Sequence, residues 1–178
     1  MKKFVLPLAA ALVLAACGGG DVSTESADTD GDGSLSMSEA GRAVDRAGAV
    51  RPKAGKYEAT IRVSGMEMPG MPAEMAGGEG FTTSTQYCLT QEEVDSGWEG
   101  MMKEGQDGDC NYERFDIDDG EMDAIMVCKS PDGDMRMAFS GTVGETASDL
   151  TATMTGGIDG GEEGTMQFTA KHRRIGDC

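Results

Sequence analysis

Side-chain oxygens recur at short, regular intervals between residues 28 and 39, where the chain reads Asp-Thr-Asp-Gly-Asp-Gly-Ser-Leu-Ser-Met-Ser-Glu. Calcium is a hard cation that takes about 6–8 oxygen ligands at about 2.3–2.6 Å, many of them from carboxylates. A single loop with this spacing can wrap its oxygens around one ion. We therefore expect a calcium site made by Asp28, Asp30, Asp32, Ser34 (through its backbone carbonyl), Ser36 and Glu39.

This spacing resembles the EF-hand loop, with acids at positions one, three and five, Gly33 at six for the sharp turn and Glu39 at twelve. Ser36 and Glu39 also form a capping box, which predicts a helix that ends near Gly48. The helix before the loop is missing or very short, and the sequence holds no second loop to pair with it. We expect a calcium affinity of about 0.1–1 mM, as in extracellular modules. The alternative is a solvated acidic turn in a tether.

The first sixteen residues have the pattern of a secretory signal, with a basic start, a short apolar run and small residues at the end. The apolar run falls short of the ~20 residues that a spanning helix needs. Leu14-Ala15-Ala16-Cys17 resembles the lipobox of bacterial lipoproteins, which implies cleavage before Cys17 and a lipid anchor there, with acyl chains such as palmitate. Gly18 in place of Asp implies the outer membrane of the envelope, facing the periplasm. The alternative is an ordinary secretory signal with a coincidental cysteine.

Four further cysteines remain once Cys17 is assigned to lipid, and an even number in an exported chain indicates two disulfides. Three pairings are possible. We favour Cys110–Cys128, because these residues flank a predicted hairpin, together with Cys88–Cys178, which would tie the chain end to the middle of the domain. A zinc site is the alternative, but the sequence lacks a C-x-x-C motif and has one His.

From Lys56 onward, apolar and polar side chains alternate with the period of half-buried strands. Asp118-Asp119-Gly120 predicts a hairpin, and Thr90 with Glu93 predicts the start of one short helix. We expect a mainly β fold: one strongly curved antiparallel sheet, open or closed, in a meander of about seven strands with the helix against one side. The predicted strands lie at 56–64, 81–88, 110–117, 121–128, 135–139, 150–154 and 166–172.

These elements predict five segments along the chain. They are a signal peptide at 1–16, a flexible lipidated tether at 17–27, a separate small EF-hand-like module at 28–48, a linker at 49–55 and a β domain at 56–178.

The β domain resembles the DUF3617 family of bacterial exported proteins from about residue 51 to the end. The resemblance rests on Arg51-Pro52-Lys53-Ala54-Gly55-Lys56-Tyr57-Glu58, Gly70-Met71-Pro72, Cys88-Leu89-Thr90-Gln91-Glu92, Cys110-Asn111-Tyr112, Cys128 and the closing Arg173-Arg174-Ile175-Gly176-Asp177-Cys178. Tyr57 stands where Trp is commoner, and Gln91 where Pro is commoner. The resemblance implies a periplasm-facing β domain with disulfides and implies no activity.

Charge and motif content narrow the function classes. The chain has 32 acidic and 15 basic side chains and a net charge of −17, which disfavours nucleic acid and anionic lipid head groups as partners. The single histidine, His172, and the lack of a phosphate loop or dinucleotide motif leave no basis for catalysis. We expect a non-enzymatic envelope protein whose β domain has a binding or structural role, and no protein partner is indicated.

Two alternative roles stay open. The curved sheet, lined by Met and Phe side chains, could cup a lipid or another apolar molecule, and a pocket of several hundred Å³ between sheet and helix would favour such a carrier. The Met-rich loop with Met66, Met68, Met71 and Met75 offers thioethers, which are soft ligands for Cu(I). A flexible apolar loop that covers the sheet is the simpler interpretation of that loop.

Overall fold

The structure is a computed structural model that describes residues 21–68, 80–104, 109–129, 133–157 and 163–178. Its main feature is one eight-stranded antiparallel sheet in the order β1-β4-β5-β6-β7-β8-β2-β3. The predicted fold class is confirmed, and the strand beyond the seven expected is the two-residue β1. The strands are β1 (Leu35–Ser36), β2 (Gly55–Glu67), β3 (Thr82–Leu89), β4 (Asp109–Asp118), β5 (Glu121–Lys129), β6 (Met135–Val143), β7 (Ala147–Gly157) and β8 (Glu163–Gly176).

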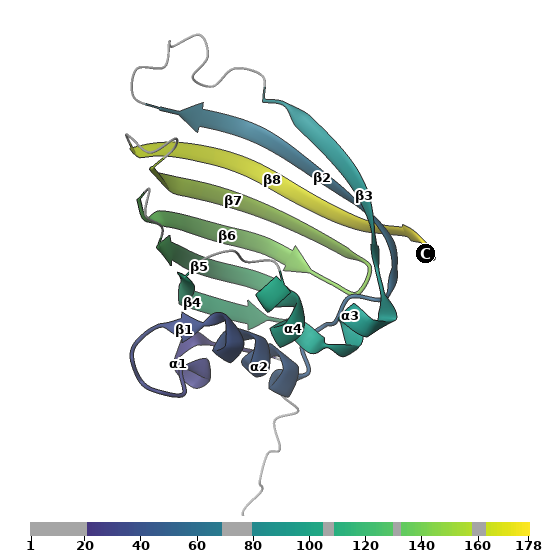
Figure 1. Cartoon of the computed structure of the whole chain (residues 1–178), viewed down its shortest axis with the longest axis horizontal. Coiled ribbons are helices and arrows are strands. Elements are labelled where there is room, and N and C mark those ends of the chain that lie inside the picture. The colour runs from purple at the N-terminus through teal and green to yellow at the C-terminus, as the bar shows by residue number, and fades with distance from the viewer. Residues whose placement is uncertain (1–20, 69–79, 105–108, 130–132, 158–162) are drawn as a thin grey trace, which may run out of the picture.

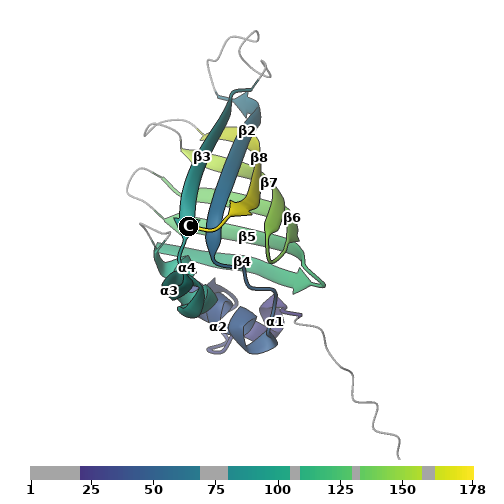
Figure 2. The same cartoon turned by 90° about the vertical axis from the view of Figure 1, so that its right-hand side faces the viewer.

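The sheet is an open, strongly curved trough. Strands β4 to β8 follow one another as a meander, β2 then pairs with β8, and β3 forms the far edge. The sheet does not close on itself, because β1 and β3 lie at opposite edges. Figure 1 shows the helices gathered at one end of this trough and β2 and β3 at the opposite side of the sheet from β4 and β5. Figure 2 shows that β2 and β3 run steeply across the direction of β4 and β5.

The β4–β5 hairpin follows the turn chemistry of its sequence. Asp119 and Gly120 both have positive φ, at 48° and 82°. A two-residue turn of this kind matches the twist of the strands that it joins. A one-residue register shift between Tyr112 and Arg114 of β4 then places Cys110 directly opposite Cys128.

The described residues also form four short helices: α1 (Thr24–Ala27), α2 (Met37–Ala47), α3 (Gln91–Asp95) and α4 (Gly97–Glu104). The capping box of Ser36 and Glu39 begins α2, and Gly48 ends it in the left-handed conformation, as predicted. The prediction of one helix after Thr90 is wrong. The first helix ends before Gly97, whose φ is +75°, and a second helix begins at Gly97. Within the described ranges, no helix has the length and apolar character needed to cross a membrane.

The N-terminal segment is less separate than its sequence predicts. Residues 21–27 were expected to belong to a flexible tether, but Val22 is buried and bridges Ile117 of β4 through two backbone hydrogen bonds of 2.8 Å. The segment predicted as a separate module at 28–48 packs into the same core as the sheet, because α2 buries Ala40 and Val44 there. The spacing of Ala40 and Val44 indicates that this helix has an apolar face, but the sequence does not indicate which surface covers that face.

The hydrophobic core occupies one end of the trough. It joins α1, β1 and α2 to the inner faces of β4 and β5, with Phe115, Leu35 and Val44 as its largest fully buried side chains. On the other five strands, the buried apolar residues are Tyr57, Ala59, Val63 and Ala152. The inner face of the sheet is therefore filled at the β4–β5 end and much less so elsewhere.

Candidate functional site

The predicted calcium loop brings three of its acids together. Ligand oxygens of Asp28, Asp30 and Asp32 all lie within 4.8 Å of one another. Backbone N–H groups of Gly31 and Gly33 donate to the two Asp28 oxygens at 2.7 and 3.0 Å, and Gly33 has the φ of +85° that the sharp turn needs. Three hard oxygen donors at this spacing fit a cation such as calcium.

Glu39, the predicted ligand at position twelve, does not join these three. Its carboxylate accepts hydrogen bonds from the backbone and hydroxyl groups of Thr29 and of Ser36, at 2.5–3.2 Å. These bonds, from Thr29 first and then from Ser36, lower the pKa of Glu39 to about 2. The hydroxyl of Ser34 donates to Asp32 at 2.9 Å. The loop thus has the expected turn, with its last acidic ligand held in the cap of α2.

In paired EF-hands, the loop pairs with a second loop. In this chain, the EF-hand-like loop pairs with strand β4 of the sheet. Leu35, at position eight of the loop, is fully buried and pairs with Tyr112 of β4, and Ser36 pairs with Asn111. This pairing anchors the lone loop to the β domain, a contact that the sequence did not indicate.

Several predicted residues lie outside the described ranges. Cys17, the predicted lipidation site, belongs to the segment before residue 21, and Met71 and Met75 of the proposed copper loop lie between residues 69 and 79.

Both favoured disulfides are present, Cys110–Cys128 and Cys88–Cys178. The first joins directly paired residues of β4 and β5 inside the core. The second joins the edge strand β3 to the chain end after β8, and β2 lies between these two strands. The disulfide therefore holds the outer edge of the trough in place.

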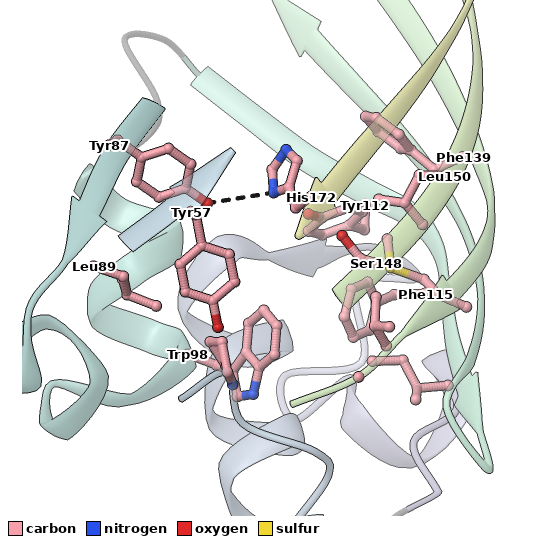
Figure 3. A pocket seen from close by; sticks show the side chains of 15 residues that line it. Tyr57, Tyr87, Leu89, Trp98, Tyr112, Phe115, Phe139, Ser148, Leu150 and His172 are labelled. Atoms are coloured by element: carbon pink, nitrogen blue, oxygen red, sulfur yellow. Dashed lines mark hydrogen bonds between the residues drawn. The ribbon is translucent and has the colours of Figure 1, made fainter. Parts of the chain in front are cut away.

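An apolar cavity of about 370 Å³ lies on the inner face of the sheet, beside the helices. Figure 3 shows Tyr57, Tyr87 and Leu89 on one side of it, Phe115, Phe139 and Leu150 on the other, His172 near one end and Trp98 near the other. All strands except β1, together with α4, contribute side chains. The lining consists of Pro52, Tyr57, Tyr87, Leu89, Trp98, Tyr112, Phe115, Ile117, Met122, Phe139, Val143, Gly144, Ser148, Leu150 and His172.

Helix α2 positions Trp98. The Asp45 carboxylate of α2 accepts a 3.2 Å hydrogen bond from the Trp98 backbone N–H, at the beginning of α4, and also binds Arg51 at 2.7 Å. The helices approach closely at Gly41, where a Cβ atom would lie 2.4 Å from the Glu99 Cα. Glycine at this position is what allows α4 to lie against α2 and hold its indole in the cavity.

A few polar groups interrupt the apolar wall. Tyr57 stacks on Tyr87 with ring centroids 5.7 Å apart, and its hydroxyl donates to the backbone carbonyls of Lys53 and Glu145 at 2.8 and 3.1 Å. The Tyr87 hydroxyl lies 3.4 Å from His172 Nδ1 (Figure 3). Ser148 of β7 is the cross-strand partner of His172 on β8, so the two share the inner face.

Burial shifts the pKa values of the titratable side chains that line the cavity. It raises the pKa of Tyr112 to about 12 and also raises the pKa of Tyr87. Burial lowers the pKa of His172, so the imidazole is neutral at pH 7. No lining residue carries a carboxylate, an ammonium or a guanidinium group, although the chain as a whole has a net charge of −17. The cavity is thus a neutral, apolar site within an acidic protein.

The sequence predicted part of this cavity. Alternation in the sequence places Tyr57, Phe139, Leu150 and His172 on the apolar faces of their strands, and helical spacing places Trp98 on an apolar face of its helix. Two basic neighbours of His172, Lys171 and Arg173, bind the carboxylate of Asp149. The contribution of β3 was missed, because its eight residues show almost no apolar alternation and lie mostly exposed.

Comparison with known proteins gives one match. A family profile described as "Protein of unknown function (DUF3617)" matches residues 52–178. Neither the curated proteins nor the solved structures that were searched contain a significant match to the chain.

Proposed function

The chain belongs to the DUF3617 family, whose description gives no activity, and from the chain's own residues we propose that the inner face of its sheet binds an apolar small molecule. The observation that carries this proposal is the cavity of about 370 Å³. Protein interiors hold few voids larger than a water molecule, so a cavity of this size is unusual in a packed core. Ligand sites are concave and mostly apolar, with a few polar groups, and the cavity has these properties.

The residues around the cavity indicate a ligand-binding site and not a loosely packed part of the core. The packed core lies at the β4–β5 end, so aromatic side chains at the other end of the cavity, such as Tyr87, keep part of their surface open. Burial of apolar surface contributes about 25 cal/mol per Å², and a ligand that covers these rings would gain that energy. Past the cavity, the inner face continues with partly buried Met137, Met154, Met166 and Phe168, which could contact a longer apolar chain.

The chain contains one tryptophan, Trp98, and that residue lines the cavity, which provides an internal probe. The apolar dye N-phenyl-1-naphthylamine absorbs where tryptophan emits. The dye is titrated into the full mature chain (residues 17–178) carrying Cys17→Ser, which lacks both the apolar leader and the lipid, so that no detergent is needed. It should quench Trp98 emission and saturate at one molecule per chain. Linear, non-saturating quenching would refute the proposal.

We further propose that the protein is anchored in the cell envelope by lipid on Cys17, with the sheet in the periplasm. The support is the lipobox-like sequence before Cys17, and Gly18 favours the outer membrane. Two acyl signals give lasting attachment, because each buried methylene adds about 0.8 kcal/mol. In cells fed labelled palmitate, the chain should become labelled and the Cys17→Ser variant should not. Equal labelling of both would contradict the anchor.

A second candidate function is calcium binding by the 28–39 loop, supported by the convergence of the Asp28, Asp30 and Asp32 oxygens. Binding would require Glu39 to exchange its hydrogen bonds with Thr29 and Ser36 for the ion. We expect a dissociation constant of about 0.1–1 mM. Calorimetric titration should give calcium heat that Glu39→Gln removes, since the variant loses the bidentate carboxylate. Heat that is unchanged in Glu39→Gln would reject this site.

The neutral state of His172 predicts a pH dependence for ligand binding. Burial lowers the pKa of His172 below its ordinary value of about 6.5. The imidazole therefore accepts a proton only when the pH falls below that ordinary value. A charge in an apolar wall opposes a ligand that removes its water, so dye affinity should fall as the pH decreases through this range. His172→Phe should give nearly pH-independent affinity. An equal acid response in both proteins would assign the effect to another group.

A further inference from the structure

We infer that the cavity selects an uncharged ligand with an apolar body and one hydroxyl or carbonyl oxygen, and that this oxygen binds beside Ser148 and His172. The inference rests on the proposed function and adds the chemical class of the ligand. Two independent features carry it: the absence of charge in the lining, and the position of the polar groups that remain.

The lining holds no permanent charge that could pair with a charged ligand. None of its residues is acidic, and none is Lys or Arg. The cations closest in sequence to His172 are already paired, since Lys171 and Arg173 both bind Asp149 and Arg174 binds Asp177. Transfer of an unpaired carboxylate into such a site is far more costly than transfer of a neutral oxygen. The net charge of −17 adds a long-range repulsion against anions.

The polar groups are few. Tyr57 uses its hydroxyl hydrogen on two backbone carbonyls, and the Trp98 Nε1–H, which has no partner among the described residues, lies at the other end of the cavity from His172 (Figure 3). The remaining polar side chains are Tyr112 on β4 and Tyr87, His172 and Ser148 on β3, β8 and β7. Tyr87 lies 3.4 Å from His172 Nδ1, whereas His172 Nε2 and the Ser148 hydroxyl have no hydrogen-bond partner among the described residues.

These two open groups suit one neutral oxygen. When Tyr87 donates to Nδ1, the neutral imidazole carries its hydrogen on Nε2 and can donate it to a ligand. The Ser148 hydroxyl can rotate to donate or to accept. A carbonyl oxygen can accept from both groups, and a ligand hydroxyl can accept from one and donate to the other. A hydrocarbon would leave both polar groups covered and unpaired, which is unfavourable.

Three probe molecules of nearly equal shape distinguish the exclusion of charge from the contact with a neutral oxygen. They are 2-ethylnaphthalene, which has no oxygen, 2-acetylnaphthalene, which has a neutral oxygen, and 2-naphthoate, which has a charged one. Each is titrated calorimetrically at pH 8 into the full mature chain carrying Cys17→Ser, and then into the same chain with Ser148→Ala. The matched control is Ser140→Ala, because Ser140 is exposed on the outer face of β6.

We expect Ser148→Ala to weaken 2-acetylnaphthalene about fivefold, the effect of one hydrogen bond, and to change 2-ethylnaphthalene by less than about twofold. His172→Phe should act in the same direction, and Ser140→Ala should change neither probe. We expect 2-naphthoate to bind at least about tenfold more weakly than 2-acetylnaphthalene.

The outcomes distinguish this inference from the proposed function. If the two neutral probes bind but Ser148→Ala affects them equally, the cavity binds apolar ligands and the oxygen contact is refuted. If 2-naphthoate binds as tightly as 2-acetylnaphthalene, selection for an uncharged ligand is refuted. If none of the three probes binds, the proposed function fails and this inference fails with it.

Discussion

Leu150→Trp should lower the affinity of the chain for N-phenyl-1-naphthylamine by at least about tenfold. Leu150 lies on the inner face of β7 and lines the cavity opposite Tyr57 and Tyr87 (Figure 3). The larger indole would occupy space that we assign to the ligand. Because the cavity is already present, the added ring need not displace packed neighbours, and the variant should fold with little loss of stability. Direct excitation of the bound dye measures the affinity without dependence on the added tryptophan.

Ile175→Trp is the matched control, because Ile175 is 48% exposed near the end of β8 and does not line the cavity. This variant adds the same indole and should bind dye like the parent chain. If Leu150→Trp binds dye as tightly as Ile175→Trp, the dye does not occupy the cavity and the assignment of the site is wrong.

Loss of the Cys88–Cys178 disulfide should produce the second large effect. This bond closes a segment of 90 residues, and restriction of the unfolded chain by a loop of that length is worth about 4–5 kcal/mol. The double variant Cys88→Ser/Cys178→Ser should lower the free energy of unfolding by about that amount. It should also weaken dye binding, because the bond holds β3, the edge strand that supplies Tyr87 and Leu89 to the cavity. Urea denaturation and dye titration measure the two effects.

Cys110→Ser/Cys128→Ser provides the comparison. Its sequence separation is 18 residues, which corresponds to about 3 kcal/mol in the same treatment. Both residues lie in the core on adjacent strands, away from the open edge of the trough, so removal of this bond should affect dye binding less. Equal loss of binding in the two double variants would mean that the edge strand has no special part in holding the cavity together.

Much of the fold follows from local patterns in the sequence. Alternation from Lys56 onward, the Asp119-Gly120 turn and the cap residues Ser36 and Thr90 each act over a few residues, and each produces the element that it predicts. The break at Gly97 was not predicted, because a glycine within an apolar helical pattern is compatible with a continuous helix. Gly97 has a φ of +75°, and the next residue, Trp98, donates its backbone N–H to Asp45 on a different helix, a long-range contact that the local pattern does not contain.

Long-range pairing explains what the sequence left open at the candidate site. The three acids of the loop are neighbours in sequence, so their convergence could be predicted. The bridge between Val22 and Ile117, the pairing of Leu35 with Tyr112 and the cavity itself depend on segments far apart in the chain. A cavity is also the absence of side chains at a point in space, and no local pattern of residue types encodes such an absence directly.

The most direct test of the proposed function is an NMR experiment on the full mature chain carrying Cys17→Ser, saturated with 2-ethylnaphthalene. Isotope-filtered nuclear Overhauser effects report protons of the ligand and the protein that lie close together. We expect cross-peaks from the naphthalene protons to Leu150, Phe139 and Trp98, all of which line the cavity. Cross-peaks confined to residues outside the cavity, or no cross-peaks at saturating ligand, would contradict the claim that the inner face of the sheet binds an apolar molecule.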